Sequence, residues 1–303
     1  MKIIYLKKIL KKFKKDIIFN ADIKKKNWFN IGGKAKIFFR PAELKDLIEF
    51  LKILGNREKI HVIGAGSNTL ITDEIFDGVI IKLGKNFNHL SKLRPDVVIS
   101  GAAVTDKRLS EFAAENNLSG FEFLSCIPGT VGGGIKMNAG CFGSEIKDIL
   151  LSIQVIDQLG NVSSIQSDEI NFDYRANNLS DDLIFLSASF KGKSKDSKII
   201  FETMKELKIK KDINQPTRVK TSGSTFKNPK NITNKKAWEL IKESVPSDIR
   251  FGDACISKKH SNFFVNKGNA KFSDMKKLIN YVEKCVFNKT GINIEKEIKI
   301  LEN

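Results

Sequence analysis

Apolar residues recur at helical spacing in two long segments of this chain, and each segment carries an end signal. In residues 41–56 the stripe stops before Gly55, and it consists of Leu44, Leu47, Ile48, Leu51 and Leu54. In residues 273–291, Ser273 stands at the expected N-cap, and the stripe consists of Met275, Leu278, Ile279, Val282 and Val286. Both segments are predicted to be amphipathic helices, and residues 105–117 predict a third, capped by Thr105.

The N-terminus carries a similar stripe among lysines, formed by Ile3, Leu6, Leu10, Phe13 and Ile17. The lysines interrupt any apolar core, which excludes a signal peptide, and no uncharged apolar run is long enough for a transmembrane helix. A helix lying on a membrane surface is one interpretation. We favour a basic helix packed on its own protein.

Short apolar runs between turn residues predict strands at 59–64, 76–83 and 95–104. Residues 149–166 predict a hairpin with Gly160 and Asn161 in its turn. Helices and strands mix without a regular alternation, which indicates an α+β fold rather than a doubly wound sheet. The polar, charged stretch that starts at Lys191 indicates a domain junction near residue 195.

Composition narrows the function classes only slightly. The chain has 303 residues, with 52 Lys and Arg against 35 Asp and Glu, for a net charge of +17. This excess would suit nucleic acid or an anionic small substrate, but the lysines are spread along the whole chain, which favours a solvated surface. The four cysteines form no C-x-x-C pair, so no metal site is expected, and their scatter is typical of a reducing compartment.

Two glycine-containing loops are the candidate ligand sites. Gly64 and Gly66 follow a predicted strand, but Thr69 replaces the third glycine of a dinucleotide motif, and no helical stripe follows. Backbone N–H groups of such a loop can still bind phosphate. In the second loop, residues 127–140, apolar residues are interleaved with glycines, unlike a flexible linker. Two ordered glycine loops favour one extended, phosphate-bearing ligand.

Six motifs in register then carry a resemblance to a known family. They are "NWFNIGGKAKIFFRP", "GAGSNTLITDEIFDGVIIKL", "GFEFLSCIPGTVGGGIKMNAG", "DYRANN", "GSTFKNP" and "SKKHSNFFVN". The array, from about Asn27 to Glu297, resembles the UDP-N-acetylenolpyruvoylglucosamine reductases of peptidoglycan precursor synthesis, in their shorter form. The resemblance implies an FAD-binding module of the vanillyl-alcohol-oxidase-like type over residues 1–195, with subdomains of about 1–83 and 84–195, and a smaller α+β substrate domain over 196–303.

The resemblance also implies the chemistry. An enolpyruvyl ether of a UDP-sugar is reduced to UDP-N-acetylmuramate, with non-covalent FAD and with NADPH as co-substrate. A cytoplasmic monomer without a nucleic-acid partner is expected. Hydride addition beside a carboxylate builds negative charge there, which needs a cation and a proton donor. By motif, Arg175 stabilises the charge, Ser224 donates the proton, and Glu297, rather than Glu295, assists the carboxylate.

The remaining site residues follow from the same motifs. The residues implied to bind the cofactor are Gly64, Ala65, Gly66, Ser67, Asn68, Ile127, Pro128, Gly129, Thr130, Gly132, Gly133, Asn138 and Gly140. The residues implied to contact the substrate are Tyr174, Lys227, Asn228, His260 and Asn262. Cys126 departs from the family, which commonly has glycine there, and a small buried side chain is the expected role. The alternative function is another FAD-dependent oxidoreductase built on the same module.

Overall fold

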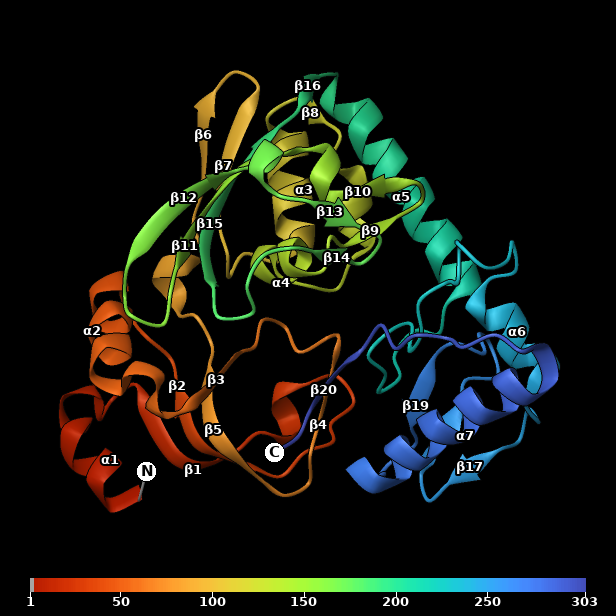
Figure 1. Ribbon diagram of the computed structural model, residues 1–303. Coiled ribbons are helices and arrows are strands. Elements are labelled where there is room, and N and C mark those ends of the chain that lie inside the picture. The colour runs from red at the N-terminus through yellow and green to blue at the C-terminus, as the bar shows by residue number, and fades with distance from the viewer. Residues whose placement is uncertain (1–2) are drawn as a thin grey trace. The chain divides into compact units, whose positions relative to one another are not determined.

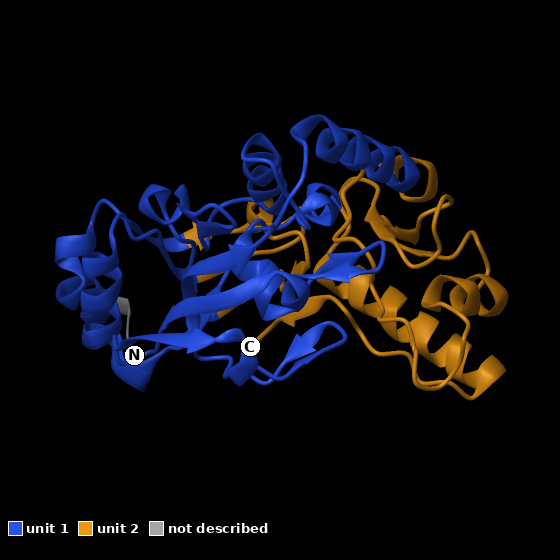
Figure 2. Cartoon of the chain, turned by 90° about the horizontal axis from the view of Figure 1, so that it is seen from above, with its two compact units in different colours: residues 1–20, 36–65, 77–211 blue, residues 21–35, 66–76, 212–303 orange. Residues whose placement is uncertain are grey.

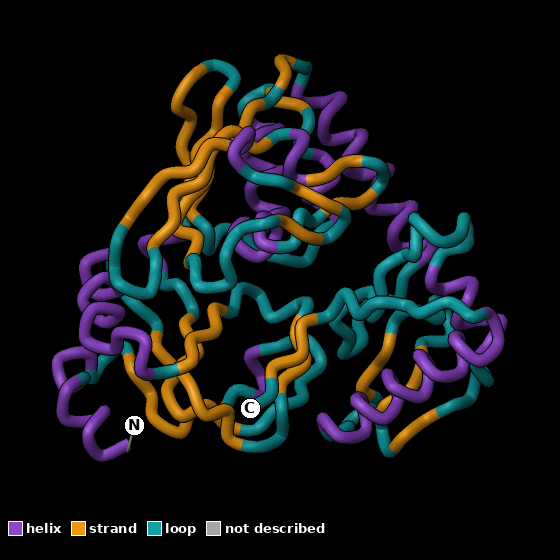
Figure 3. The backbone as a smooth tube through the Cα atoms, viewed as in Figure 1, coloured by secondary structure: helices purple, strands orange, loops and turns teal. Residues whose placement is uncertain are grey.

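The computed structural model describes residues 3–303 and divides the chain into two compact units (Figures 1 and 2). Unit 1 contains residues 1–20, 36–65 and 77–211, and unit 2 contains residues 21–35, 66–76 and 212–303. The last junction therefore lies inside a long helix, α5 (Ser197–Asn214), rather than near residue 195. Each unit mixes helices and strands, as the tube in Figure 3 shows, so the α+β prediction is confirmed.

The first sheet of unit 1 has the strand order β1-β2-β5-β3. Its strands are β1 (Ile17–Asp22), β2 (Lys34–Phe39), β5 (Ile75–Ile81) and β3 (Lys59–Val62), and β3 runs parallel to β5. Helix α2 (Leu44–Leu54) buries Leu47, Phe50, Leu51 and Leu54, and Gly55 ends it with φ +53°. The predicted helix and its end at Gly55 are confirmed. Glycine suits this end, because a residue without a Cβ adopts a positive φ at little cost.

The N-terminal segment packs on the same core. Helix α1 (Ile3–Ile9) is followed by a 3₁₀ turn (Lys11–Phe13), and Leu6, Leu10 and Phe13 are buried together with α2 residues. The interpretation of a basic helix packed on its own protein is confirmed for these side chains, while the side chain of Ile3 lies outside the described residues. The predicted length was wrong, because the β-branched run that starts at Ile17 forms β1 instead of a helix.

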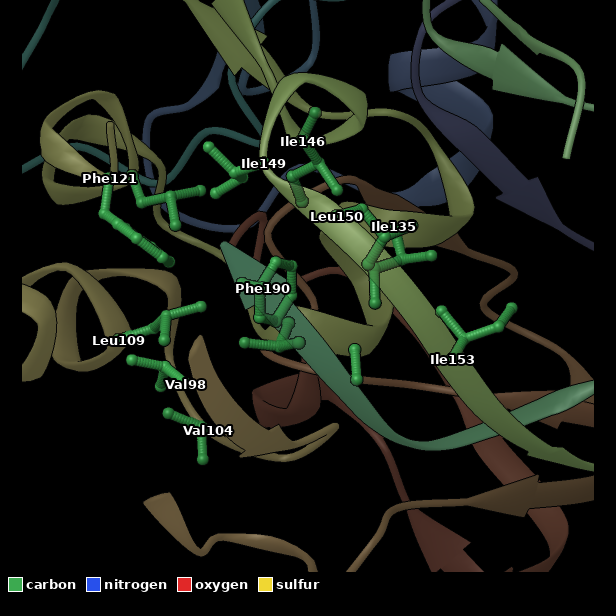
Figure 4. Close-up of a cluster of buried hydrophobic side chains, with 14 of the residues drawn as sticks. Val98, Val104, Leu109, Phe121, Ile135, Ile146, Ile149, Leu150, Ile153 and Phe190 are labelled. Atoms are coloured by element: carbon green, nitrogen blue, oxygen red, sulfur yellow. The ribbon is translucent and has the colours of Figure 1, made fainter. Parts of the chain in front are cut away.

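The second sheet of unit 1 is antiparallel, with the order β12-β11-β15-β7-β6. Its strands are β12 (Val162–Gln166), β11 (Leu150–Ile156), β15 (Ile184–Lys191), β7 (Val97–Gly101) and β6 (Leu90–Arg94). The predicted hairpin is β11 and β12. Helices α3 (Asp106–Glu115) and α4 (Val131–Lys136) contribute to the core of this sheet, in which Figure 4 shows Val104, Leu109, Ile135 and Ile146.

Short strand pairs complete unit 1. They are β8 (Leu118–Ser119) with β16 (Lys193–Ser194), β9 (Gly140–Cys141) with β10 (Ser144–Glu145), and β13 (Phe172–Asp173) with β14 (Ala176–Asn177). The last two pairs matter for function, because the second glycine loop runs into β9 and the "DYR" motif forms the turn between β13 and β14.

Unit 2 is built around a long helix, α7 (Phe272–Thr290), which buries all five residues of its predicted stripe. Its other elements are β4 (Thr69–Ile71), α6 (Ala237–Ser244), β17 (Arg250–Phe251), β18 (Ala254–Ile256), β19 (Phe264–Asn266) and β20 (Lys299–Leu301). The predicted Ser273 cap is wrong, because the N-cap is Lys271, whose N–H donates to the Asp274 carboxylate (3.0 Å). The next N–H, that of Phe272, donates to the Asp73 carboxylate (2.6 Å). No helix among residues 3–303 is long and apolar enough to cross a membrane.

Candidate active site

Gly64 of the first glycine loop lies against Thr130 of the second, and both residues belong to unit 1. A Cβ placed on Gly64 would be 2.3 Å from the Thr130 hydroxyl oxygen, so only glycine allows this approach. The first loop runs directly from β3, and no helix follows it, as predicted. Their contact is consistent with the expectation that both loops serve one ligand.

Three backbone hydrogen bonds attach the second loop to residues 102–106, at the start of α3. The Val131 N–H donates to the Val104 carbonyl (2.9 Å), the Gly132 N–H donates to the Ala102 carbonyl (2.9 Å), and the Asp106 N–H donates to the Gly129 carbonyl (3.2 Å). The loop is therefore an ordered part of the fold. It continues into α4, a helix that the sequence pattern did not predict, since three of its six residues are glycine.

Other N–H groups of this loop have no partner within residues 3–303. The N–H groups of Gly129, Thr130 and Gly133 form no hydrogen bond there. Gly129 and Thr130 are consecutive, and unpaired N–H groups of successive residues can form an anion-binding concavity. The residues present therefore fit the phosphates of a dinucleotide such as FAD.

Gly132 and Gly133 differ in the space around them. A Cβ on Gly132 would lie 3.1 Å from the Ala102 Cβ, so this glycine is needed for packing. A Cβ on Gly133 would meet only the Thr130 hydroxyl oxygen, at 3.5 Å, and Gly133 is exposed. The fold itself leaves room for a side chain at Gly133, so only a bound ligand would require glycine at this position.

Arg175 lies in the turn between β13 and β14, in the left-handed region with φ 57°. Its guanidinium donates to the Gly140 carbonyl (2.5 Å) and to the Asn138 carbonyl (3.4 Å), and it lies 5.2 Å from the centre of the Tyr174 ring. A bulky residue rarely adopts this backbone conformation, and strained residues concentrate at functional sites. The carbonyls of the second glycine loop thus orient Arg175, which the motif predicts to be catalytic.

Asn138 supports the same turn from the loop side. Its φ is 41°, its side chain is buried, and its amide donates to Glu145 (3.0 Å) and to the Asp173 carbonyl (3.0 Å). These bonds connect the loop to the strand that precedes Arg175. Its predicted cofactor contact stays a prediction.

Cys126 is buried, as expected for a small apolar side chain. Its sulfur lies 3.8 Å from the Ser125 hydroxyl oxygen, and the nearby Cys141 thiol donates to the Phe123 carbonyl (3.3 Å). The Cys126 side chain and burial raise the pKa of Cys141. Neither sulfur forms a disulfide, and a thiol with a raised pKa is a poor nucleophile.

Ser224 and Glu297 come together in unit 2. The Ser224 backbone forms a bridge with Phe263, while the next residue, Thr225, accepts the Glu297 N–H at its carbonyl (2.8 Å). The Glu297 carbonyl in turn accepts the Asn68 side-chain amide (3.1 Å). The two predicted catalytic residues of this unit and one predicted cofactor residue therefore occupy one small region.

The neighbouring backbone favours Glu297 over Glu295 for the catalytic role. Glu295 is exposed and pairs with the Lys227 ammonium group (3.3 Å), whereas Glu297 is half-buried. Because Glu297 pairs with Thr225, it lies one residue from Ser224 along the opposing segment. The prediction itself stays untested.

The predicted substrate residues of unit 2 have clear structural partners. The Asn262 amide is buried and exchanges two hydrogen bonds with the Phe226 backbone (2.9 and 2.8 Å). Asn228 accepts the Ala237 N–H (3.0 Å) at the start of α6. His260 packs edge-on against Phe263, with ring centroids 4.7 Å apart, and burial lowers its pKa, so its imidazole is neutral at pH 7. Substrate contact by these residues stays a prediction.

The sequence patterns did not identify Asp106, a buried acid near the second glycine loop. Asp106 follows the Thr105 cap, whose hydroxyl accepts the Arg108 N–H (3.2 Å), and nothing in the sequence separates it from an ordinary first-turn acid. Among the described residues, no cluster of three or more His, Cys, Asp or Glu could hold a metal ion.

Comparison with known proteins covers the whole chain. Residues 35–166 match the model of an FAD binding domain, and residues 215–301 match the model named UDP-N-acetylenolpyruvoylglucosamine reductase, C-terminal domain. The UDP-N-acetylenolpyruvoylglucosamine reductase of Pelagibacter ubique is 60% identical over 302 residues, which is 100% of both chains. That of Rickettsia akari is 42% identical over 92% of this chain and 94% of its own. The crystal structure of the Thermus caldophilus reductase superposes with a TM-score of 0.80 at 29% identity, covering 95% of this chain and 98% of its own.

Proposed function

The chain belongs to the UDP-N-acetylenolpyruvoylglucosamine reductase family, and from this premise we propose how its residues carry out the reaction. The protein is an FAD-containing oxidoreductase of peptidoglycan precursor synthesis, and it reduces the enolpyruvyl ether of a UDP-sugar to UDP-N-acetylmuramate with NADPH. The chemistry that bound FAD would supply is hydride transfer between NADPH and the substrate double bond.

The two glycine loops hold the phosphates of FAD in this proposal. The supporting observation is the contact of Gly64 with Thr130, together with the unpaired N–H groups of Gly129, Thr130 and Gly133. Backbone N–H groups in such a concavity favour anions without any basic side chain. The first loop contributes Gly64 to Asn68, and the second contributes Ile127 to Gly140.

Arg175 stabilises the negative charge that develops on the substrate carboxylate. Its planar guanidinium stays protonated and suits a carboxylate, and the Gly140 and Asn138 carbonyls fix its orientation. Glu297 assists the same carboxylate. Ser224 delivers the proton to the carbon next to it, and a hydroxyl can do so only because that carbon is strongly basic at that moment.

The loop assignment is tested by a pair of substitutions. Because Gly133 has open space around it, Gly133→Val should leave the fold and the melting temperature of the FAD-free protein nearly unchanged while FAD content falls sharply. Gly132→Ala is the comparison, because it crowds Ala102 and should lower stability as well. Full FAD occupancy in a stable Gly133→Val protein would mean that the loop does not hold the cofactor.

The serine assignment is tested by separating the two half-reactions in stopped-flow absorbance. Ser224→Ala should allow flavin reduction by NADPH at a near-normal rate and slow reoxidation by the UDP-sugar by roughly 10²–10⁴-fold, the usual contribution of a proton donor. Ser222→Ala, which removes a hydroxyl that bonds the Thr69 carbonyl (3.4 Å), is the matched control. Equal slowing of both steps in Ser224→Ala would assign the serine a structural role.

A different flavin oxidoreductase activity on the same module is the second candidate. It predicts rapid oxygen consumption and slow reduction of the UDP-sugar, the reverse of our expectation. We also propose that the protein is a cytoplasmic monomer that binds no nucleic acid. Sedimentation and a mobility-shift assay with DNA test the last two points.

A further inference from the structure

The Asp106 carboxyl group has no hydrogen-bond partner in the part of the chain that the structure describes. The side chain is fully buried, and neither oxygen forms a hydrogen bond within residues 3–303. Burying an ionised carboxylate without a partner is costly, so the group neutralises instead. Burial raises the pKa of Asp106 to about 8, which keeps it uncharged at pH 7.

This carboxyl lies directly beneath the second glycine loop. A Cβ on Gly129 would be 2.4 Å from one oxygen of Asp106, and a Cβ on Gly134 would be 3.2 Å from the other. The loop therefore rests on the carboxyl at both ends of the turn that carries the unpaired N–H groups. Val104 and Leu109, which lie near Asp106 in sequence, belong to the apolar cluster in Figure 4, so the carboxyl group adjoins an apolar core.

Charged side chains on the surrounding elements do not offset this acid, since they pair with other groups. On α3, Lys107 and Arg108 pair with Glu111, and Arg108 also pairs with Glu115. On α4, Lys136 pairs with Asp181 and bonds the Leu179 and Ser180 carbonyls. Beyond α4, Lys147 pairs with Glu145. Residues 127–130 of the loop carry no charge.

We propose that Asp106 is a positioning residue for FAD: uncharged, it supports the backbone of Gly129–Gly134 against the cofactor phosphates, and the loss of its proton weakens FAD binding. An ionised Asp106 would place a negative charge under the same N–H groups that face the phosphates, in a medium that screens it poorly. The inference rests on the proposed function, since it requires FAD at this loop.

The test is the pH dependence of FAD affinity, measured by flavin fluorescence on diluting the holoenzyme between pH 6.5 and 9. For the natural chain we expect a Kd that is constant at the acidic end and rises toward roughly tenfold per pH unit above the pKa. Asp106→Asn cannot ionise and should give a flat profile. Asp106→Ser provides a second neutral side chain if the first variant folds poorly. Asp96→Asn, at a half-exposed carboxylate that pairs with Lys191 (3.7 Å), is a control that should keep the natural profile.

Two results would overturn the inference. A Kd that does not change with pH in the natural chain would refute it without any variant. An equal rise in the natural chain and in Asp106→Asn would assign the pH dependence to another group, and a purely structural role for Asp106 predicts this outcome. A protein that takes up no FAD even at pH 6.5 would instead contradict the proposed function.

Discussion

Removing the ring of Phe13 tests whether the basic N-terminus is part of the core. Phe13 is 3% exposed, and its ring packs edge-on against Phe39 and Phe50, with centroids 5.6 and 5.8 Å away. Phe13→Ala should lower the free energy of unfolding by about 3–5 kcal/mol, the usual cost of emptying a buried phenylalanine site. Since globular proteins are stable by about 5–15 kcal/mol, the loss would be a large share of the total.

Urea denaturation followed by far-ultraviolet circular dichroism measures this loss, because neither tryptophan lies in unit 1. Phe13→Leu keeps an apolar side chain and loses the aromatic pairs, each worth about 0.5–1.5 kcal/mol, so its effect should be smaller. Tyr5→Ala, on the exposed side of α1, is the matched control and should change stability by less than about 0.5 kcal/mol.

The competing interpretation, a helix that lies on a membrane, predicts a different pattern. Phe13→Ala would then leave stability in solution unchanged and reduce binding to anionic vesicles. A loss below about 1 kcal/mol, with weaker vesicle binding, would refute the packing argument, since a ring that contacts lipid contributes little to the soluble fold.

Three further predictions concern the elements around the glycine loop. Thr105→Ala should cost about 0.5–2 kcal/mol of stability in thermal unfolding, because it removes the cap on the Arg108 N–H. Thr105→Ser keeps a hydroxyl at this position and should lose less; equal losses in the two variants would show that the cap does not contribute to stability. The native state holds a proton on Asp106 that the unfolded state releases above pH 3.8, so stability should fall by up to about 1.4 kcal/mol per pH unit from roughly pH 4 to 8 through this group. In Asp106→Asn that contribution should vanish, and an unchanged slope in urea titrations would contradict it. Iodoacetamide at pH 7.5 should modify Cys141 much more slowly in the native protein than in urea, because its native pKa is raised; equal rates by mass spectrometry would show an ordinary thiol.

Local patterns predicted the helices whose cores and caps lie close in sequence. The five apolar positions of α7 and the Thr105 cap depend on periodicity and on one hydroxyl three residues from its partner. Ser273 is not the cap, because at the start of α7 the Lys271 N–H donates to Asp274 and the Phe272 N–H donates to Asp73, 199 residues away in the chain. The bond to Asp274 is local, whereas the tertiary contact with Asp73 leaves no trace in a single sequence.

Helix α4 shows a second limit of sequence patterns. Three glycines in six residues disfavour a helix by propensity, and they leave no apolar stripe to detect. Gly132 and Gly134 pack closely against Ala102 and Ile146, where a Cβ would lie 3.1 and 2.6 Å from the nearest side-chain atoms. Here the tertiary environment selects both the residue type and the conformation, so motif resemblance located the loop while propensity could not describe it.

Motifs predicted the candidate site residues, but only the structure shows which of them contact one another. Arg175 occupies a strained backbone conformation, which persists only if neighbouring contacts stabilise it. Those contacts are the Gly140 and Asn138 carbonyls at the end of the loop that rests on Asp106 at its start. A change in the charge of Asp106 would therefore act on the loop that also orients the guanidinium, so cofactor binding and the placement of Arg175 share one structural support.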